Sequence, residues 1–156
     1  MTTAQYQSPL GIITMVSDGT SLTELLWAAL PNDSANQDLP IFADTCRWLD
    51  LYFSGKKPDF TPPLAPQGTP FQQKVWRELL TIPYGQTTTY GAIARSVGCR
   101  SAQAIGQAVH RNPIAIIIPC HRVIGADGSL TGYASGLDIK QQLLRIENNL
   151  FIFVPQ

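Results

Sequence analysis

The sequence is poor in the residues that mark membrane, secreted or metal-centred proteins. No run approaches the ~20 apolar residues of a membrane span, and residues 1–5 lack the basic and apolar character of a secretory signal. There are three Cys without close spacing, and two His, His110 and His121. This excludes a disulfide framework and a Cys-x-x-Cys zinc site and favours a reducing compartment. We expect a cytoplasmic protein with no metal site and no cofactor.

Net charge is absent as well, but the charges are unevenly distributed. Residues 1–67 hold three Lys or Arg against seven Asp or Glu, and residues 68–156 hold eight against four. No carboxylate lies between Leu79 and Ala126. The basic residues of that stretch are Arg95, Arg100, Arg111 and Arg122. A basic stretch without carboxylates predicts contact with phosphate, although a chance arrangement on a solvated face would look the same.

The length and the prolines suggest two parts. One hundred and fifty-six residues with 44% hydrophobic side chains fit one domain, or a domain with a subdomain. Between Lys56 and Pro70 there are five prolines, which predict a stiff, extended connection. We place an N-terminal supporting subdomain at residues 1–62 and a C-terminal domain at residues 68–156.

The first part reads as strands followed by a helix. Residues 10–16 and 22–27 are β-rich and are separated by Asp18-Gly19, a hairpin signal. Apolar residues then recur at helical spacing over residues 41–53, with Asp38 as the expected cap. Nothing in this part suggests catalysis.

The second part reads as mostly helical. Thr69 and Gln72 predict a capping box. Thr89 is expected to cap a helix over residues 90–97, and Ser101 one over 102–111, so the pair is a helix-turn-helix candidate. Asp138 and Gln141 are the expected caps of a last helix.

The strongest chemical signal is Cys120-His121. Residues 113–117 are apolar and predict a buried strand or extended segment, which Pro119 ends. A neighbouring His can take the proton of a thiol, and Arg122 can stabilise the thiolate. Glu147 lies near the end of the last helix, where the helix dipole opposes a carboxylate, so it is a candidate to orient His121.

Three functions fit these residues alone. A nucleophile, a base and an orienting carboxylate fit a cysteine hydrolase. The helix-turn-helix candidate fits a DNA-binding protein in which Cys120 is structural or redox-sensing. Transfer of a group from DNA to Cys120 is the third.

Pro119-Cys120-His121-Arg122-Val123 resembles the active-site signature of the methylated-DNA–protein-cysteine methyltransferases, the O6-alkylguanine-DNA alkyltransferases. Asn112-Pro113 and Gly132-Tyr133 lie at the family's spacing, and the likeness runs from about Gly68 to Glu147. It implies an α+β protein with a small N-terminal α/β subdomain of the ribonuclease H-like kind. It also implies a mostly helical C-terminal domain with a winged helix-turn-helix.

The same resemblance implies DNA repair by one irreversible, stoichiometric transfer. An alkylated guanine, with O4-alkylthymine as a second candidate lesion, is flipped out of double-stranded DNA, and its alkyl group passes to Cys120. His121 takes the thiol proton through a water and Glu147 orients His121. Tyr90 matches a family tyrosine that reaches the guanine ring nitrogen. Asn112 matches a family asparagine that braces the active-site turn. The resemblance implies a monomer without a cofactor.

The implied substrate and DNA contacts include one departure from the family. Gln103 stands where the family has an arginine that fills the gap left by the flipped base, and Arg100 lies one helical turn earlier. The expected contacts to base and DNA are Gln103, Arg100, Arg111, Arg122, Val123, Tyr133, Ala134 and Ser135.

Overall fold

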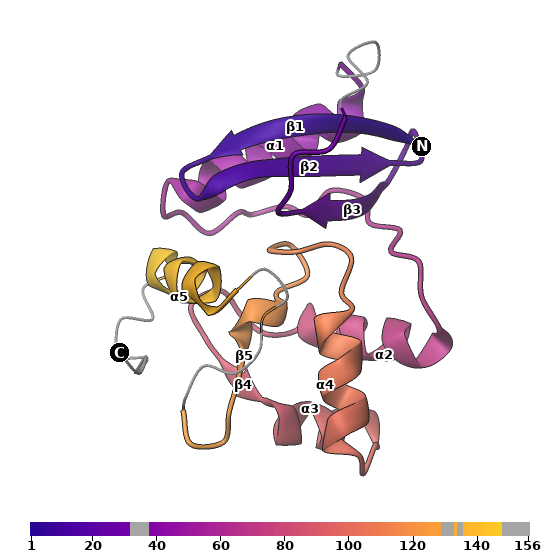
Figure 1. Cartoon of the computed structure of the whole chain (residues 1–156), viewed down its shortest axis with the longest axis vertical. Coiled ribbons are helices and arrows are strands. Elements are labelled where there is room, and N and C mark those ends of the chain that lie inside the picture. Colours follow the sequence, from indigo (N-terminus) through magenta and orange to yellow (C-terminus); the bar gives the residue numbers. More distant parts are fainter. Residues whose placement is uncertain (32–37, 129–132, 134–135, 148–156) are drawn as a thin grey trace. The chain divides into compact units, whose positions relative to one another are not determined.

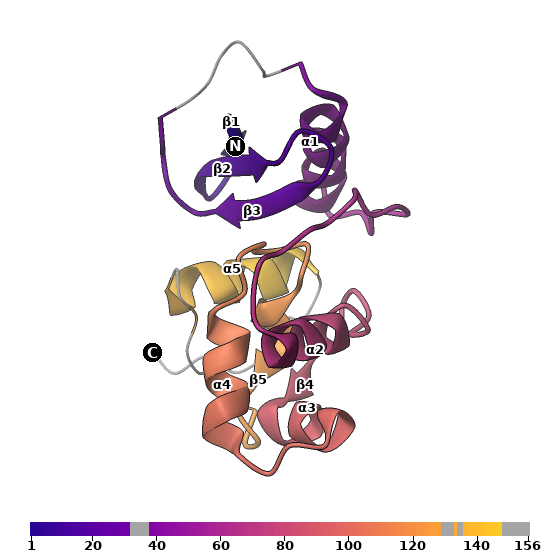
Figure 2. The ribbon, with the colours of Figure 1, turned by 90° about the vertical axis from the view of Figure 1, so that its right-hand side faces the viewer.

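The computed structural model describes residues 1–31, 38–128, 133 and 136–147. The chain forms two compact units, Met1–Gln67 with Pro113–Ala115 and Gly68–Asn112 with Ile116–Gln156. The predicted α+β class is confirmed: the first unit holds an antiparallel sheet and one helix, and the second is mostly helical (Figures 1 and 2). None of the helices in the described residues has the length and apolar character needed to cross a membrane.

The sheet of the first unit has the antiparallel order β1-β2-β3. Its strands are β1 (Thr2–Ser8), β2 (Gly11–Ser17) and β3 (Leu22–Leu26). The hairpin predicted at Asp18-Gly19 is confirmed, and the Asp18 carboxylate accepts the Ser21 amide at 2.8 Å across the turn. Sequence analysis missed β1, because its polar side chains do not show the apolar alternation of a half-buried strand.

Helix α1 (Pro40–Phe53) lies against one face of this sheet (Figure 2). Tyr6 of β1 donates its hydroxyl to the Asp50 carboxylate at 2.6 Å and stacks on Phe53. The predicted cap Asp38 is wrong, since the N-cap position is Leu39 and makes no side-chain cap bond. Pro40 at the first helical position has no amide hydrogen, so this helix start needs one fewer partner.

The apolar run before Cys120 is buried as predicted, but only its first residues are extended. Ile114 forms a parallel bridge with Leu25, whose amide donates to the Pro113 carbonyl at 2.9 Å. The chain then turns, and Ile116 takes φ +70°. A β-branched residue is strained in this left-handed region, by about 1–3 kcal/mol, and such strain persists where the surrounding packing fixes the backbone.

The second unit begins with three short helices, α2 (Pro70–Leu79), α3 (Tyr90–Val97) and α4 (Ala102–His110). Local cap chemistry gives all three starts as predicted. Thr69 and Gln72 form a capping box, and Thr89 and Ser101 accept amides two or three residues inside their helices. Gly98 ends α3 at φ +73°, and the turn to α4 completes the helix-turn-helix pair (Figure 1).

Two contacts bring the functional segments of this unit together. The Trp76 indole on α2 donates to the Ala108 carbonyl of α4 at 2.8 Å, which fixes the helix-turn-helix pair on α2. Strand β4 (Thr88–Thr89) pairs in parallel with β5 (Val123–Ile124). Because β4 leads directly into α3 and β5 directly follows the cysteine turn, this pairing places the start of α3 beside the segment that follows that turn.

The last helix, α5 (Leu137–Ile146), begins differently from the prediction. Its N-cap is Gly136 at φ +107°, without a side-chain cap bond. Asp138 lies inside the first turn and Gln141 further along, so neither caps the helix as expected. Glycine is suited to this position because side chains are strained at that φ.

Candidate active site

Cys120 opens a single turn of 3-10 helix, η2 (Cys120–Arg122), directly after Pro119. The residue is half-buried, and burial raises the pKa of its thiol. A hydrogen bond from Asn112 and the positive charge of Lys140 act in the opposite direction. The cysteine is therefore held where its thiolate needs specific support, which the surrounding side chains must supply.

Asn112 fixes the backbone that presents this cysteine. Its side-chain amide donates to the Ile118 carbonyl at 2.7 Å, and the same carbonyl accepts the Cys120 amide at 2.8 Å. Asn112 lies just after the C-cap of α4, so it ties the helix-turn-helix pair to the cysteine turn. The resemblance to the family implied a bracing role for Asn112, and that role stays a prediction.

His121, Glu147 and Arg122 form one buried network. The His121 Nε2 lies 2.6 Å from one Glu147 oxygen, and both side chains are fully buried. The Arg122 guanidinium donates Nε–H to the other oxygen at 2.8 Å and Nη2–H to the first at 3.2 Å. This fork holds the carboxylate plane, and the carboxylate in turn fixes the imidazole ring.

The charges of this network settle its protonation state. Burial by itself would raise the pKa of Glu147, but His121 and Arg122 outweigh it and lower that pKa to about 2. Burial lowers the pKa of His121, against the attraction of Glu147. Since Arg122 already balances the carboxylate, His121 is neutral and donates Nε2–H to Glu147. Its other nitrogen, Nδ1, is then the basic one.

Arg122 does not face solvent, and its expected contact with base or DNA stays a prediction. It is 7% exposed, and besides Glu147 it donates Nη1–H to the Ile82 carbonyl at 2.8 Å. The Tyr84 ring lies 5.7 Å from its guanidinium carbon. Sequence position suggested a surface charge because Arg122 falls in the carboxylate-free stretch, whereas its partner Glu147 is distant in the chain.

Glu147 has a favourable place despite lying at the C-cap of α5. The helix dipole opposes a carboxylate there by a few tenths to about 1 kcal/mol. The Arg122 fork and the Gly85 amide, which donates at 3.2 Å, offset that penalty. The unfavourable position in the sequence therefore does mark a carboxylate with a specific partner.

Lys140 is a site residue that sequence analysis missed. It is fully buried on α5, and its ammonium donates to the Val123 carbonyl at 2.6 Å. Burial lowers its pKa to about 8, while its interaction with Cys120 opposes that shift. Its spacing from the buried Leu143 and Leu144 is that of one helical face, a signal that could have identified it.

The expected DNA-binding residues lie apart from this network. Arg100, Gln103 and Arg111 are exposed in or beside α4. Val123 is buried, and its carbonyl already accepts from Lys140, with a second lone pair remaining. Tyr133 is half-buried and its carbonyl accepts the Gly136 amide at 2.9 Å. Ala134 and Ser135 lie outside the described residues.

Tyr90 opens α3 and meets the other histidine. Its hydroxyl lies 3.3 Å from the His110 Nε2, and the two rings meet edge to face with centroids 6.2 Å apart. His110 is the last residue of α4. The histidine that sequence analysis left without a role thus contacts a residue it singled out.

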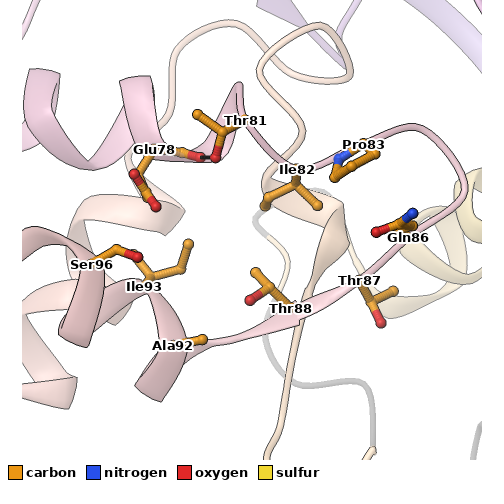
Figure 3. A pocket seen from close by; sticks show the side chains of 10 residues that line it. All are labelled: Glu78, Thr81, Ile82, Pro83, Gln86, Thr87, Thr88, Ala92, Ile93 and Ser96. Atoms are coloured by element: carbon orange, nitrogen blue, oxygen red, sulfur yellow. Dashed lines mark hydrogen bonds between the residues drawn. The ribbon is translucent and has the colours of Figure 1, made fainter.

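A separate pocket of about 230 Å³ lies between the end of α2, the following loop and α3 (Figure 3). Its apolar floor includes Ile82 and Ile93, and Glu78, Thr88 and Ser96 are among its polar side chains. None of the residues that line it belongs to the expected site. The carbonyl of Ile82, one of its lining residues, accepts from Arg122 and so connects the pocket with the network at Cys120.

Known proteins of one family are similar to this chain over nearly its whole length. The family described as 6-O-methylguanine DNA methyltransferase matches in two parts, its ribonuclease-like domain at residues 1–66 and its DNA binding domain at residues 70–149. The methylated-DNA–protein-cysteine methyltransferase of Methanosarcina acetivorans is 46% identical over 153 residues, covering 94% of this chain and 97% of its own. That of Methanosarcina barkeri is 49% identical over 150 residues, covering 92% and 94%.

A solved structure extends the comparison to three dimensions. The Mycobacterium tuberculosis O6-methylguanine methyltransferase superposes with a TM-score of 0.83 at 42% identity, covering 95% of this chain and 93% of that one. The protein from that organism crystallised with DNA has a TM-score of 0.85 at 41% identity, covering 96% and 94%. On this sequence and structural similarity, the chain belongs to the 6-O-methylguanine DNA methyltransferase family.

Proposed function

We propose that the chain repairs DNA by moving the alkyl group of O6-alkylguanine onto Cys120. The general reaction, alkyl transfer from DNA to a protein cysteine, follows from membership of the family. The choice of Cys120 rests on one observation: it adjoins the buried network of His121, Glu147 and Arg122. Cys46 and Cys99 are also half-buried, but no such network adjoins them.

The first step is removal of the thiol proton. The Nε2 of His121 is held by Glu147, so Nδ1 receives the Cys120 proton, through a water as in the family picture. The imidazolium formed then lies 2.6 Å from an ionised carboxylate, which stabilises it. Lys140 adds positive charge near the sulfur and so favours the thiolate.

The second step is displacement at the alkyl carbon. The thiolate attacks in line, the S–C bond forms, and the bond from carbon to O6 breaks with its electron pair left on the base. Tyr90 gives its phenolic proton to the ring nitrogen, so the base leaves as neutral guanine. The thioether has no ready leaving group, so each molecule reacts once.

The exposed side of α4 is the proposed DNA surface. Arg100 and Arg111 supply charge for phosphates, and Gln103 stands at the position expected to enter the stack. The reacting sulfur is half-buried, so the base must leave the duplex to reach it. The solved complex of the M. tuberculosis relative with DNA supports this proposal. One copy of the chain carries all these residues, and we propose that it acts as a monomer.

The test is the mass of each cysteine peptide after incubation with duplex DNA that carries one O6-methylguanine. We expect one methyl group on the Cys120 peptide and none on those of Cys46 or Cys99. Cys120→Ala should still bind the duplex and take up no methyl. Methyl on another cysteine would refute the assignment. Binding without transfer would favour a lesion-binding protein, and repeated turnover with excess substrate would favour a hydrolase.

A further inference from the structure

We propose that His110 is a positioning residue that supplies the proton Tyr90 gives to the departing base. The observation is the contact between the His110 Nε2 and the Tyr90 hydroxyl, 3.3 Å apart, with the rings edge to face at 83°. The inference rests on the proposed function, because it gives Tyr90 the role of proton donor.

The two residues are placed for this by the helix ends that carry them. Tyr90 is the first residue of α3 and is held there by the Thr89 cap, whose hydroxyl accepts the Ala92 amide at 3.1 Å. His110 is the last residue of α4 and is exposed to solvent. A helix C-terminus interacts favourably with a cation, so the protonated imidazole suits this position.

The direction of the hydrogen bond matters for the chemistry. A neutral imidazole that accepts the phenolic hydrogen at Nε2 would turn it away from a base. A protonated imidazole donates Nε2–H to the phenol oxygen, so the phenolic hydrogen is free to point elsewhere. The distance is at the long end for a hydrogen bond, as is common in active sites before substrate binds.

Every proton and every bond in the transfer can be followed. The thiol proton goes to His121, the S–C bond forms, and the bond from carbon to O6 breaks. The base takes the phenolic proton at its ring nitrogen. As the phenolate develops, the His110 proton moves from Nε2 to the Tyr90 oxygen, and solvent reprotonates the exposed imidazole. Tyr90 ends as a neutral phenol and is not left as an anion beside DNA phosphates.

Histidine is suited to this role because its proton exchanges near neutral pH. The imidazole contacts Tyr90 of α3, and the charged Arg111 follows it at the C-cap of α4. Neither carries negative charge near neutral pH. An arginine or lysine at position 110 could donate a hydrogen bond to Tyr90 but would not readily give up its proton.

The test compares single-turnover transfer rates at protein concentrations that saturate the duplex, so that affinity does not enter. The variants are His110→Phe, which has no polar group, and His110→Gln, which can donate a hydrogen bond but not a proton. We expect both to react about tenfold more slowly than the wild type near pH 6, which is less than the roughly 10²–10⁴-fold of a direct general acid because His110 acts through Tyr90. The ratio of wild-type to variant rate should fall toward one at higher pH, where an imidazole no longer carries a proton to give.

Two controls isolate the route through Tyr90. In a Tyr90→Phe background, His110→Gln should have no further effect. The same should hold for a substrate with carbon in place of the ring nitrogen, because that base cannot take the proton. If His110→Gln reacts at the wild-type rate while His110→Phe is slow, His110 contributes only a hydrogen bond to Tyr90. That result would refute the supply of a proton by His110. An equal loss in the Tyr90→Phe background would show a direct DNA contact and refute it too.

These outcomes are separate from the failure of the proposed function. If wild-type Cys120 takes up no methyl, the function itself is wrong. If Cys120 is methylated but the rate ratio stays at one at every pH, only the role of His110 is wrong.

Discussion

Two regions of the second unit treat charge in opposite ways. Around Cys120, charged side chains are buried and paired, and Glu147 has two partners within 3 Å. Along α4, basic and polar side chains are exposed, as at Arg100, Gln103 and Arg111. A buried charge depends on its partner, while an exposed charge is available to a ligand. Under the proposed function, the first region tunes the reaction at Cys120 and the second contacts DNA, so substitutions should affect them differently.

The largest effect is expected from Glu147→Gln, which leaves Arg122 buried beside a neutral amide. Breaking a buried ion pair on one side typically lowers the free energy of unfolding by about 3–5 kcal/mol. Urea unfolding would measure it, and methyl transfer should slow in parallel because His121 loses its orienting partner. Asp44→Asn is the matched control. Its pair with Arg47 is exposed, at 66% for Arg47 and 42% for Asp44, so the change should stay below about 1 kcal/mol. Equal losses would contradict the contrast.

The same carboxylate should make stability depend on pH. The folded pKa of Glu147, about 2, lies below its ordinary value of 4.5, so its contribution is complete above about pH 5. It is lost as the pH falls toward 2, because the unfolded chain takes up the proton first, and the loss should reach roughly 3 kcal/mol. The lowered pKa of His121 adds a loss of the same sign, beginning below about pH 6.5. Unfolding measured from pH 7 to 3 should be flatter for Glu147→Gln, and parallel curves would refute the assignment.

Next in size is Lys140→Met, which removes the buried cation near Cys120. The pKa of the thiol should rise, and transfer near neutral pH should slow about tenfold, or about 1.4 kcal/mol. The pH dependence of Cys120 alkylation by iodoacetamide, followed on its peptide, would measure the thiol directly. Lys74→Met, an exposed lysine of α2, serves as control and should change neither. An unchanged profile in Lys140→Met would show that the lysine serves only the Val123 carbonyl.

On the exposed side, Arg111→Gln should weaken DNA binding without affecting stability. Each phosphate contact contributes about −0.9 to the slope of log affinity against log salt, so the slope should become shallower by about one. The effect should be the same for all sequences. Arg47→Gln, in the acidic first part of the chain, should keep the wild-type slope. An unchanged slope for Arg111→Gln would place the DNA surface elsewhere.

Features of the fold could be predicted from the sequence where the residues that cause them are close together in the chain. Thr69, Thr89 and Ser101 cap helices through hydrogen bonds to residues three positions away, so their roles could be predicted from the sequence. The predicted start of α5 was wrong because the helix begins at Gly136, in a conformation suited to glycine, and no side chain caps it.

Tertiary contacts limited the prediction of the site. Cys120, His121 and Glu147 were grouped in advance, and the structure places His121 and Glu147 in contact. Lys140 was missed, and the burial of Arg122 against Glu147 was not foreseen, because the partners of both residues are distant in the chain. A charged residue is normally taken as exposed, so the helical spacing of Lys140 from Leu143 and Leu144 was the one sequence signal that it is buried.

The smallest effects should come from Gln103, where the chain departs from the family's arginine. Extruding a paired base costs a few kcal/mol, and a side chain that fills the gap offsets part of it. Arginine offers a charged, planar group that stacks, whereas glutamine offers amide hydrogen bonds and less reach. Gln103 is exposed, so substitution should leave folding intact.

We therefore expect Gln103→Arg to speed methyl transfer from duplex DNA and to leave transfer from the free modified base unchanged. Gln103→Ala should slow the duplex reaction by less than about tenfold, or 1.4 kcal/mol. The free base isolates the chemistry at Cys120, because it needs no unstacking. Complete loss of duplex repair in Gln103→Ala would make Gln103 a full replacement for the arginine. If all three proteins react alike with duplex, another residue fills the gap, and the exposed Arg100 just before α4 is the next to substitute.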